Sequence, residues 1–205
     1  MKYRLFLLLF LLPVILGVSA DRPVKDAYIL SRNYEVTING TSSLRDWTEK
    51  VGDVTGDMTA ALNEDGSVDL SSIRIRMKVL SIKSDMGRVM DNKTYEALKA
   101  TACPEILFAI SVPIRLVQVR DGKTAIPVKG ELTLAGICKP VTMLVKTFEI
   151  RQGNLSFEGS QRINMSDYGV KPPSALFGTM RAGPEITIHF NTNFINQSIL
   201  TNLKN

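Results

Sequence analysis

The chain has 205 residues and a formal net charge of +5 at pH 7, of which Lys2 and Arg4 at the N-terminus supply +2. The remaining basic residues are scattered and no aromatic ladder runs among them, so the sequence gives no support to nucleic-acid binding. This length and composition predict one domain with a substantial apolar core.

Residues 1–20 are expected to be a secretory signal peptide. A short basic start is followed by an apolar run from Leu5 to Val18 and by a small-residue cleavage site that ends at Ala20. The apolar run is shorter than the roughly 20 residues of a membrane-spanning helix, and no later segment is long and apolar enough to cross a bilayer. We therefore expect residues 21–205 to form one exported domain, periplasmic or secreted, without an integral membrane span.

The exported part consists mainly of segments in which apolar and polar residues alternate, which is the pattern of half-buried strands. Turn signals separate them, at residues 63–66, 121–122, 136–140 and 152–154. One segment, residues 91–102, predicts a helix with Asp91 or Asn92 as its N-cap. The pattern predicts about eight strands, which we expect to form an all-β barrel or sandwich. The strand segments are residues 34–38 continuing through Trp47, 54–62, 73–79, 106–116, 128–134, 141–150, 155–165 and 186–194.

Residues that carry enzyme chemistry are scarce. The single histidine, His189, falls on the polar face of the last strand, and no cysteine or histidine ligand spacing surrounds it. No Gly-x-Ser-x-Gly elbow presents a nucleophile, and no glycine-rich loop leads into a helix to hold a phosphate. We therefore expect neither an enzyme nor a metal site.

The two cysteines, Cys103 and Cys138, flank the turn signal at residues 121–122. Folding the chain back at that turn places position 103 opposite about position 140, so a disulfide is geometrically reasonable in an oxidising compartment. The alternative is two buried free thiols.

The inward faces of the strands carry large or pliable side chains, among them Phe108, Phe157, Phe190, Met77 and Met165. Such residues suit a cavity that adapts to a flexible apolar chain. They also suit a core that the protein fills itself, and periodicity alone favours this simpler interpretation.

Four segments, in order across nearly the whole exported part, resemble the YceI-like family. They are INGTSSLRDWTEKVGDVTG at residues 38–56, DNKTYEALKATACPEILF at 91–108, GELTLAGICKPVTMLV at 130–145 and SDYGVKPPSALFGTMRAGPEITIHFNTNF at 166–194. The resemblance implies an extended, lipocalin-like antiparallel β-barrel with a helix near one end. It also implies that the lumen binds a polyisoprenoid, an isoprenoid quinone or a fatty amphiphile. Arg45 departs from the related pattern, which often has a histidine there, and the two cysteines are not general features of the family.

On this resemblance we expect a non-catalytic carrier or store with no cofactor other than its apolar ligand. An envelope interaction module with a self-filled core is the alternative, and pairing into a homodimer is left open. Arg45, Lys83 and Arg88 are candidates for an anionic head group, with exposed solubilising charge as the other interpretation of each. The predicted lumen residues are Trp47, Met77, Tyr95, Leu98, Phe108, Ile110, Phe157, Met165, Phe177, Ile188 and Phe190.

Overall fold

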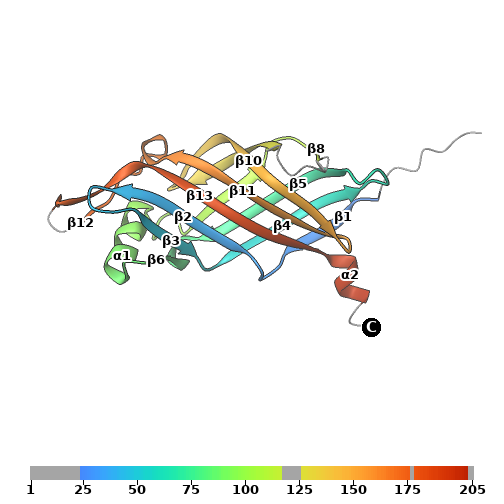
Figure 1. Cartoon of the computed structure of the whole chain (residues 1–205), viewed down its shortest axis with the longest axis horizontal. Helices are drawn as coiled ribbons and strands as arrows, with labels where there is room; N and C mark the ends of the chain where they lie inside the picture. The colour runs from blue at the N-terminus through green and yellow to red at the C-terminus, as the bar shows by residue number, and fades with distance from the viewer. Residues whose placement is uncertain (1–23, 117–125, 176–177, 203–205) are drawn as a thin grey trace, which may run out of the picture.

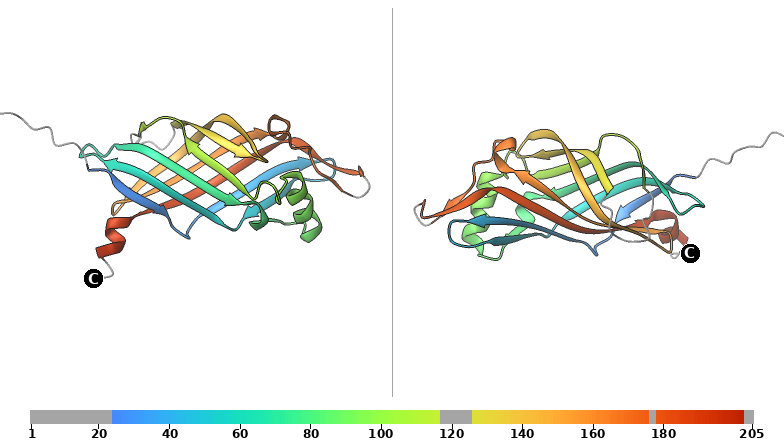
Figure 2. Two further views of the ribbon diagram at one scale, coloured as in Figure 1. Left: turned by 180° about the vertical axis from the view of Figure 1, so that it is seen from behind. Right: turned by 45° about the horizontal axis from the view of Figure 1, so that its top comes forward.

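The computed structural model describes residues 24–116, 126–175 and 178–202. Its strands form an elongated barrel, run obliquely to the long axis of that barrel, and are flanked by a helix at each end (Figures 1 and 2). The strands are β1 (Asp26–Leu30), β2 (Glu35–Ser42), β3 (Trp47–Val51), β4 (Val54–Leu62), β5 (Val68–Lys78), β6 (Ile82–Ser84), β7 (Glu105–Ile110), β8 (Ile114–Leu116), β9 (Ile126–Leu134), β10 (Ile137–Arg151), β11 (Asn154–Asn164), β12 (Ser174–Ala175) and β13 (Met180–Asn196). The helices are α1 (Arg88–Ala97) and α2 (Gln197–Asn202), with 3-10 turns η1 (Val79–Ser81) and η2 (Met165–Tyr168).

Several of these strands are consecutive pieces of one longer strand. β1 and β2 both pair with β13, through Leu30 opposite Phe194 and Glu35 opposite Asn191. In the same way β3 continues into β4, β5 into β6 and β7 into β8. Pairing of β1 with both β4 and β13 closes the sheet into an antiparallel barrel of eight strands. The predicted all-β barrel of about eight strands is confirmed.

The interior of the barrel follows from the alternation in the sequence. Along β9, Val128, Leu132 and Leu134 are buried, whereas Lys129 and Glu131 between them are exposed. Because successive side chains point to opposite faces of a sheet, each such strand contributes one apolar row to the interior. His189 is exposed on β13, as its place on the polar face predicts.

Helix α1 begins earlier than the sequence predicts. It starts at Arg88 after Gly87, whose φ of 84° suits glycine at the N-cap position. Asp91 is therefore not the cap but lies in the first turn, where it is 5% exposed and accepts a hydrogen bond from the Ser84 N–H at 2.7 Å. The helix also ends at Ala97 rather than at residue 102.

The predicted disulfide is absent, and both cysteines are free thiols. Cys138 belongs to β10, opposite Thr133 of β9, and Thr133 in turn lies opposite Leu107 of β7. A two-residue turn at Ala135 and Gly136, where the sequence predicts a turn over residues 136–140, thus places Cys138 on β10, and β9 lies between β10 and β7. The predicted hairpin turn at residues 121–122 and the predicted signal peptide at 1–20 both lie outside the described residues.

Candidate functional site

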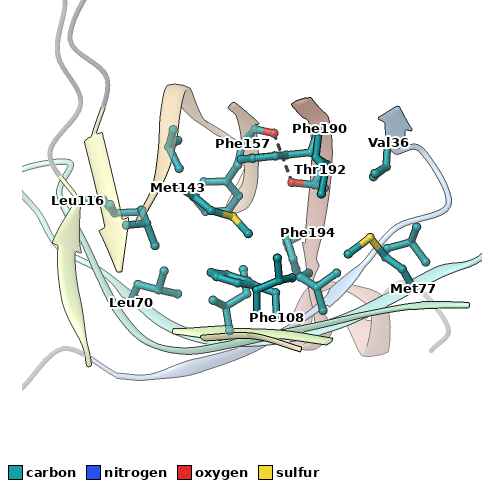
Figure 3. A pocket seen from close by; sticks show the side chains of 17 residues that line it. Val36, Leu70, Met77, Phe108, Leu116, Met143, Phe157, Phe190, Thr192 and Phe194 are labelled. Atoms are coloured by element: carbon teal, nitrogen blue, oxygen red, sulfur yellow. Dashed lines mark hydrogen bonds between the residues drawn. The ribbon is translucent and has the colours of Figure 1, made fainter. Parts of the chain in front are cut away.

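The middle of the barrel holds a cavity (Figure 3). It contains about 820 Å³ of space between protein atoms, including space open to solvent, and about 90 Å³ of this admits the centre of a water molecule. All but one of its 17 lining residues are apolar. They are Val36, Val54, Leu70, Ile73, Ile75, Met77, Phe108, Leu116, Val128, Leu132, Met143, Val145, Phe157, Ile188, Phe190, Thr192 and Phe194. We call this space the main cavity.

The one polar residue of the main cavity has a partner within the protein. The Thr192 hydroxyl donates to the Phe157 carbonyl at 3.3 Å (Figure 3). No lining residue titrates, so the walls of the main cavity offer neither an acid, a base nor a charge. Such a space favours an apolar ligand and provides no group for proton transfer.

Two aromatic rings of the main cavity lie over glycines on neighbouring strands. A Cβ added to Gly130 would stand 2.3 Å from the ring of Phe108, and one added to Gly159 would stand 2.5 Å from the ring of Phe190. Each glycine therefore leaves room for a ring to lie close to the barrel wall, as aromatic residues do over glycines in designed sheets.

A second cavity continues the main cavity toward α1, and the two share Leu132 and Ile188. We call it the inner cavity. About 60 Å³ of it admits the centre of a water molecule, compared with about 90 Å³ of the main cavity. Its two polar lining residues are Glu49 of β3 and Thr94 of α1. The apolar ones are Ile38, Trp47, Ala97, Leu98, Ile106, Leu132, Leu134, Ile163, Met165, Val170, Pro173, Ile186 and Ile188.

A cleft, which we call the outer cleft, adjoins the inner cavity, and about 20 Å³ of it admits the centre of a water molecule. The two share Trp47, Glu49, Thr94 and Pro173. The remaining lining residues of the cleft are Ser42, Ser84, Met86, Met90, Met180 and Ala182. Shared walls thus arrange the main cavity, the inner cavity and the outer cleft in a row that ends at α1.

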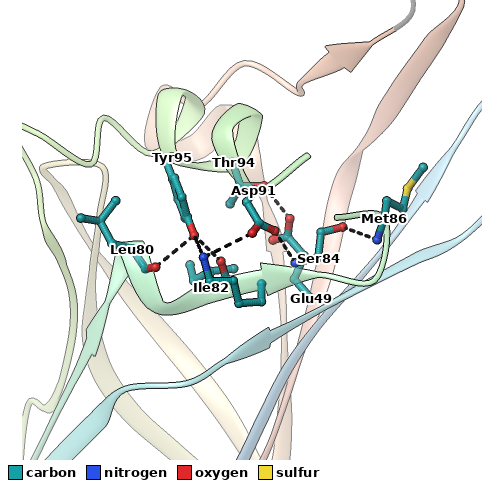
Figure 4. A network of polar contacts seen from close by, with 9 residues as sticks. Glu49, Leu80, Ile82, Ser84, Met86, Asp91, Thr94 and Tyr95 are labelled. Atoms are coloured by element: carbon teal, nitrogen blue, oxygen red, sulfur yellow. Dashed lines mark hydrogen bonds and ion pairs between the residues drawn. The ribbon is translucent and has the colours of Figure 1, made fainter. Parts of the chain in front are cut away.

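Helix α1 is tied to the barrel by a polar network (Figure 4). The Lys83 ammonium donates to the Tyr95 hydroxyl at 2.6 Å and to Asp91 at 3.3 Å. The Tyr95 hydroxyl also lies 2.8 Å and 3.0 Å from the carbonyl oxygens of Ile82 and Leu80. These contacts, with the bond from Ser84 to Asp91, hold the helix across the end of the barrel.

Glu49 is the one acid in the walls of these three spaces, and it is 4% exposed. Burial raises the pKa of its carboxyl group, and the negative charges of Asp91 and Asp85 raise it further. The hydrogen bond from Thr94 acts in the opposite direction and lowers this pKa. On balance the pKa of Glu49 is raised above its ordinary value.

The structure brings most of the predicted lumen residues together. Met77, Phe108, Phe157, Ile188 and Phe190 line the main cavity. Trp47, Leu98, Met165 and again Ile188 line the inner cavity.

Three predicted lumen residues do not line these spaces. Tyr95 belongs to the polar network outside the barrel, because its hydroxyl bonds to Lys83 and to carbonyls of β6 and η1. Ile110 packs against the core without lining a cavity. Phe177 lies outside the described residues.

The three head-group candidates are all exposed, and none lines the cavities or the outer cleft. Lys83 is engaged by Asp91 and Tyr95. Arg45 lies in the loop between β2 and β3, and Arg88 is the first residue of α1.

The sequence interpretation did not identify Glu49 as a site residue. A signal for it exists, because Trp47, Glu49 and Val51 fall on one face of a strand by simple alternation. An acid between two apolar residues on an inward face is a buried acid, and such a group is a candidate for function.

The sequence matches the family described as the YceI-like domain over residues 32–194. The chain belongs to the YceI-like family. A comparison with curated proteins gives no match. Within the described residues of this YceI-like protein, no helix has the length and apolar character needed to cross a membrane. In the same part of the chain, His, Cys, Asp and Glu side chains form no group of three or more that could hold a metal ion.

Solved structures share the fold at low sequence identity. BcnA of Burkholderia cenocepacia is 18% identical, with 78% of this chain and 95% of that chain covered and a TM-score of 0.57. A polyisoprenoid-binding domain from Saccharophagus degradans, implicated in plant cell wall breakdown, is 7% identical and has a TM-score of 0.60. The match covers 83% of this chain and 98% of that domain's chain. A YceI protein of Campylobacter jejuni is 15% identical and has a TM-score of 0.52. The match covers 72% of this chain and 83% of that chain. These structures establish the likeness of the barrel.

Proposed function

We propose that this YceI-like protein is an exported binding protein that holds a long apolar chain, most simply a polyisoprenoid or isoprenoid quinone, in the barrel lumen. It acts as a carrier or store in the periplasm or outside the cell, performs no covalent chemistry and needs no cofactor. The observation that carries this proposal is the main cavity of the barrel, whose 17 lining residues include one polar residue and no charged one. The likeness to a domain described as polyisoprenoid-binding supports it.

The physical basis is the transfer of apolar surface out of water. Each 100 Å² of apolar ligand surface that enters the lumen gains roughly 2.5 kcal/mol. Association costs about 4–15 kcal/mol in lost freedom, so a short ligand gains little and a long one is favoured. The continuation of the main cavity into the inner cavity extends the surface available to a long chain.

An interaction module with a self-filled core is the alternative function. The apolar faces of the strands agree with it, but the open space of the main cavity counts against it. It remains an outcome of the experiment below.

The experiment is ligand uptake by delipidated protein, with a radiolabelled long-chain isoprenoid as the probe. Ile188→Trp places an indole where the main and inner cavities meet, whereas Leu144→Trp makes the same kind of change on a half-exposed side chain of β10. We expect wild type and Leu144→Trp to bind the probe in a saturable manner and Ile188→Trp to bind several times less. No saturable uptake by folded wild-type protein, or equal uptake by both variants, would contradict the proposal.

A further inference from the structure

Glu49 and Thr94 stand where the apolar interior of the barrel meets the outer cleft. Both line the inner cavity and the outer cleft, and they are the two polar residues of the inner cavity. An apolar chain that extends from the main cavity into the inner cavity reaches this pair next. The pair is therefore positioned to contact the end of a chain rather than its middle.

The Glu49 carboxyl group has capacity for a further hydrogen bond. The Thr94 hydroxyl donates to Glu49 Oε1, and among the described residues it is the only hydrogen-bond partner of that carboxyl group (Figure 4). Glu49 is nevertheless 4% exposed. A carboxyl oxygen can accept more than one hydrogen bond, so a ligand group that reaches Glu49 finds hydrogen-bonding capacity that the protein itself does not use.

The surroundings of Glu49 favour its uncharged form more than water does, because they raise the pKa of its carboxyl group. Within the sheet, Glu49 lies opposite Ile38 of the neighbouring strand β2 and opposite Ser84 of the neighbouring strand β6. The charged groups near it are Asp91 of α1 and Asp85 after β6, and both disfavour its ionisation. Lys83 is bonded to Asp91 and Tyr95 instead.

An uncharged carboxylic acid both donates and accepts a hydrogen bond. It can donate to a carbonyl oxygen and can accept from a hydroxyl group. A phosphate at the same place would lie beside Asp91 and Asp85 without a cation in the cavity walls, and burial of an unpaired charge is strongly unfavourable. The site therefore discriminates by charge.

We propose that Glu49 and Thr94 form an end-group site, which takes an uncharged, oxygen-bearing end group of the bound chain, an alcohol or a ketone, and rejects a phosphorylated one. This inference rests on the proposed function, because it assumes an apolar chain in the lumen. It also moves the expected end-group contact away from Arg45, Lys83 and Arg88, which lie outside the cavities.

The test compares three probes of one chain length: a C20 isoprenoid alcohol, its diphosphate and the matching hydrocarbon. Binding to the delipidated protein is followed by the fluorescence of Trp47, the one tryptophan of the chain, which lines both the inner cavity and the outer cleft. Because one hydrogen bond is worth about tenfold in affinity, we expect the alcohol to bind about tenfold more tightly than the hydrocarbon. We expect the diphosphate to bind more weakly than the alcohol.

Variants of Glu49 identify the group responsible. In Glu49→Leu the advantage of the alcohol over the hydrocarbon disappears, while Glu105→Gln, an exposed acid at the start of β7, retains it. Glu49→Gln keeps a donor and an acceptor of similar shape, so it serves as the second variant if Glu49→Leu does not fold. A ketone of the same chain length can only accept a hydrogen bond, so in wild type its advantage over the hydrocarbon declines as pH rises through the raised pKa of Glu49, and in Glu49→Gln it stays constant.

Two results overturn this inference alone. One is tighter binding of the diphosphate than of the alcohol. The other is an alcohol preference that survives Glu49→Leu, together with a ketone preference that has the same pH dependence in wild type and Glu49→Gln. In both cases the hydrocarbon still binds, so the lumen function stands. If none of the three probes binds, the proposed function fails and the end-group site fails with it.

Discussion

Gly40→Ala is expected to displace Trp47 from its place between the inner cavity and the outer cleft. Gly40 of β2 lies opposite Trp47 of β3, and a Cβ at position 40 would stand 2.2, 2.6 and 2.9 Å from three atoms of the indole ring. Ordinary van der Waals contact begins at 3.4 Å, so the ring must move by about 1.2 Å. The Trp47 Nε1–H also donates to the Thr41 carbonyl at 3.0 Å, and this bond is lost when the ring moves.

The cost follows from these contacts. Overpacking of this kind costs about 1–3 kcal/mol, and the lost hydrogen bond costs about 1 kcal/mol more. The restricted unfolded chain of the alanine variant offsets about 0.4–1 kcal/mol of this. We expect a net loss of about 1–3 kcal/mol in the free energy of unfolding, or roughly 2–4 °C in Tm for each kcal/mol.

A double-mutant cycle with Trp47→Leu isolates the effect. Chemical denaturation gives the free energy of unfolding of each variant, and emission of the single tryptophan reports its environment in Gly40→Ala. Gly52→Ala is the control, since its nearest contact is the Ser81 carbonyl oxygen at 3.2 Å. In the Trp47→Leu background, Gly40→Ala should cost almost nothing. An equal cost in both backgrounds would refute this explanation of Gly40.

Three further changes have defined outcomes. Asp91→Ala removes the acceptor of the Ser84 N–H, so we expect a loss of about 1–3 kcal/mol in the free energy of unfolding, measured by urea titration. The raised pKa of Glu49 means that the folded state binds its proton more tightly than the unfolded state, so wild-type stability falls as pH rises above 4.5 toward the folded pKa. Glu49→Gln removes this dependence, and parallel urea midpoints of the two proteins across that range would contradict the assignment. In the native protein, Cys138 is exposed and Cys103 is partly buried, so we expect a maleimide to label Cys138 first. Peptide mass spectrometry measures the labelling rate of each thiol, and equal rates would contradict this order.

The strand pattern could be predicted because alternation has one physical meaning. Val128, Lys129, Glu131 and Leu132 can satisfy burial and solvation together only on a half-buried strand. The breaks within the long strands were harder to predict. Residues 79–81 form a 3-10 turn between β5 and β6, yet the alternating pattern runs into it.

The helix start and the cysteine pair show where local signals compete. Asp91 is a preferred N-cap residue, but its carboxylate bonds to the Ser84 N–H, and Gly87 takes the cap position. The predicted pairing of position 103 with about 140 was near the observed register, in which Leu107 lies opposite Thr133. The short turn after Leu134 decided the outcome, because it assigns Cys138 to the next strand.

The site was predictable only in part. A sequence places Phe108, Phe157 and Phe190 on inward faces, but a hollow interior and a filled one have the same alternation. The difference lies in how the rings pack, and this depends on glycines such as Gly130 and Gly159 on neighbouring strands. Contacts of this kind depend on strand register, which turn lengths fix in three dimensions.

Native mass spectrometry of the protein, purified gently from the cells that produce it, tests the central claim most directly. The released small molecule is then identified after solvent extraction, with Ile188→Trp as the matched sample. The account predicts a bound molecule with a long apolar chain on wild type and its depletion from the variant. A wild-type protein with the mass of the bare polypeptide, unchanged after incubation with long-chain isoprenoids, would contradict it.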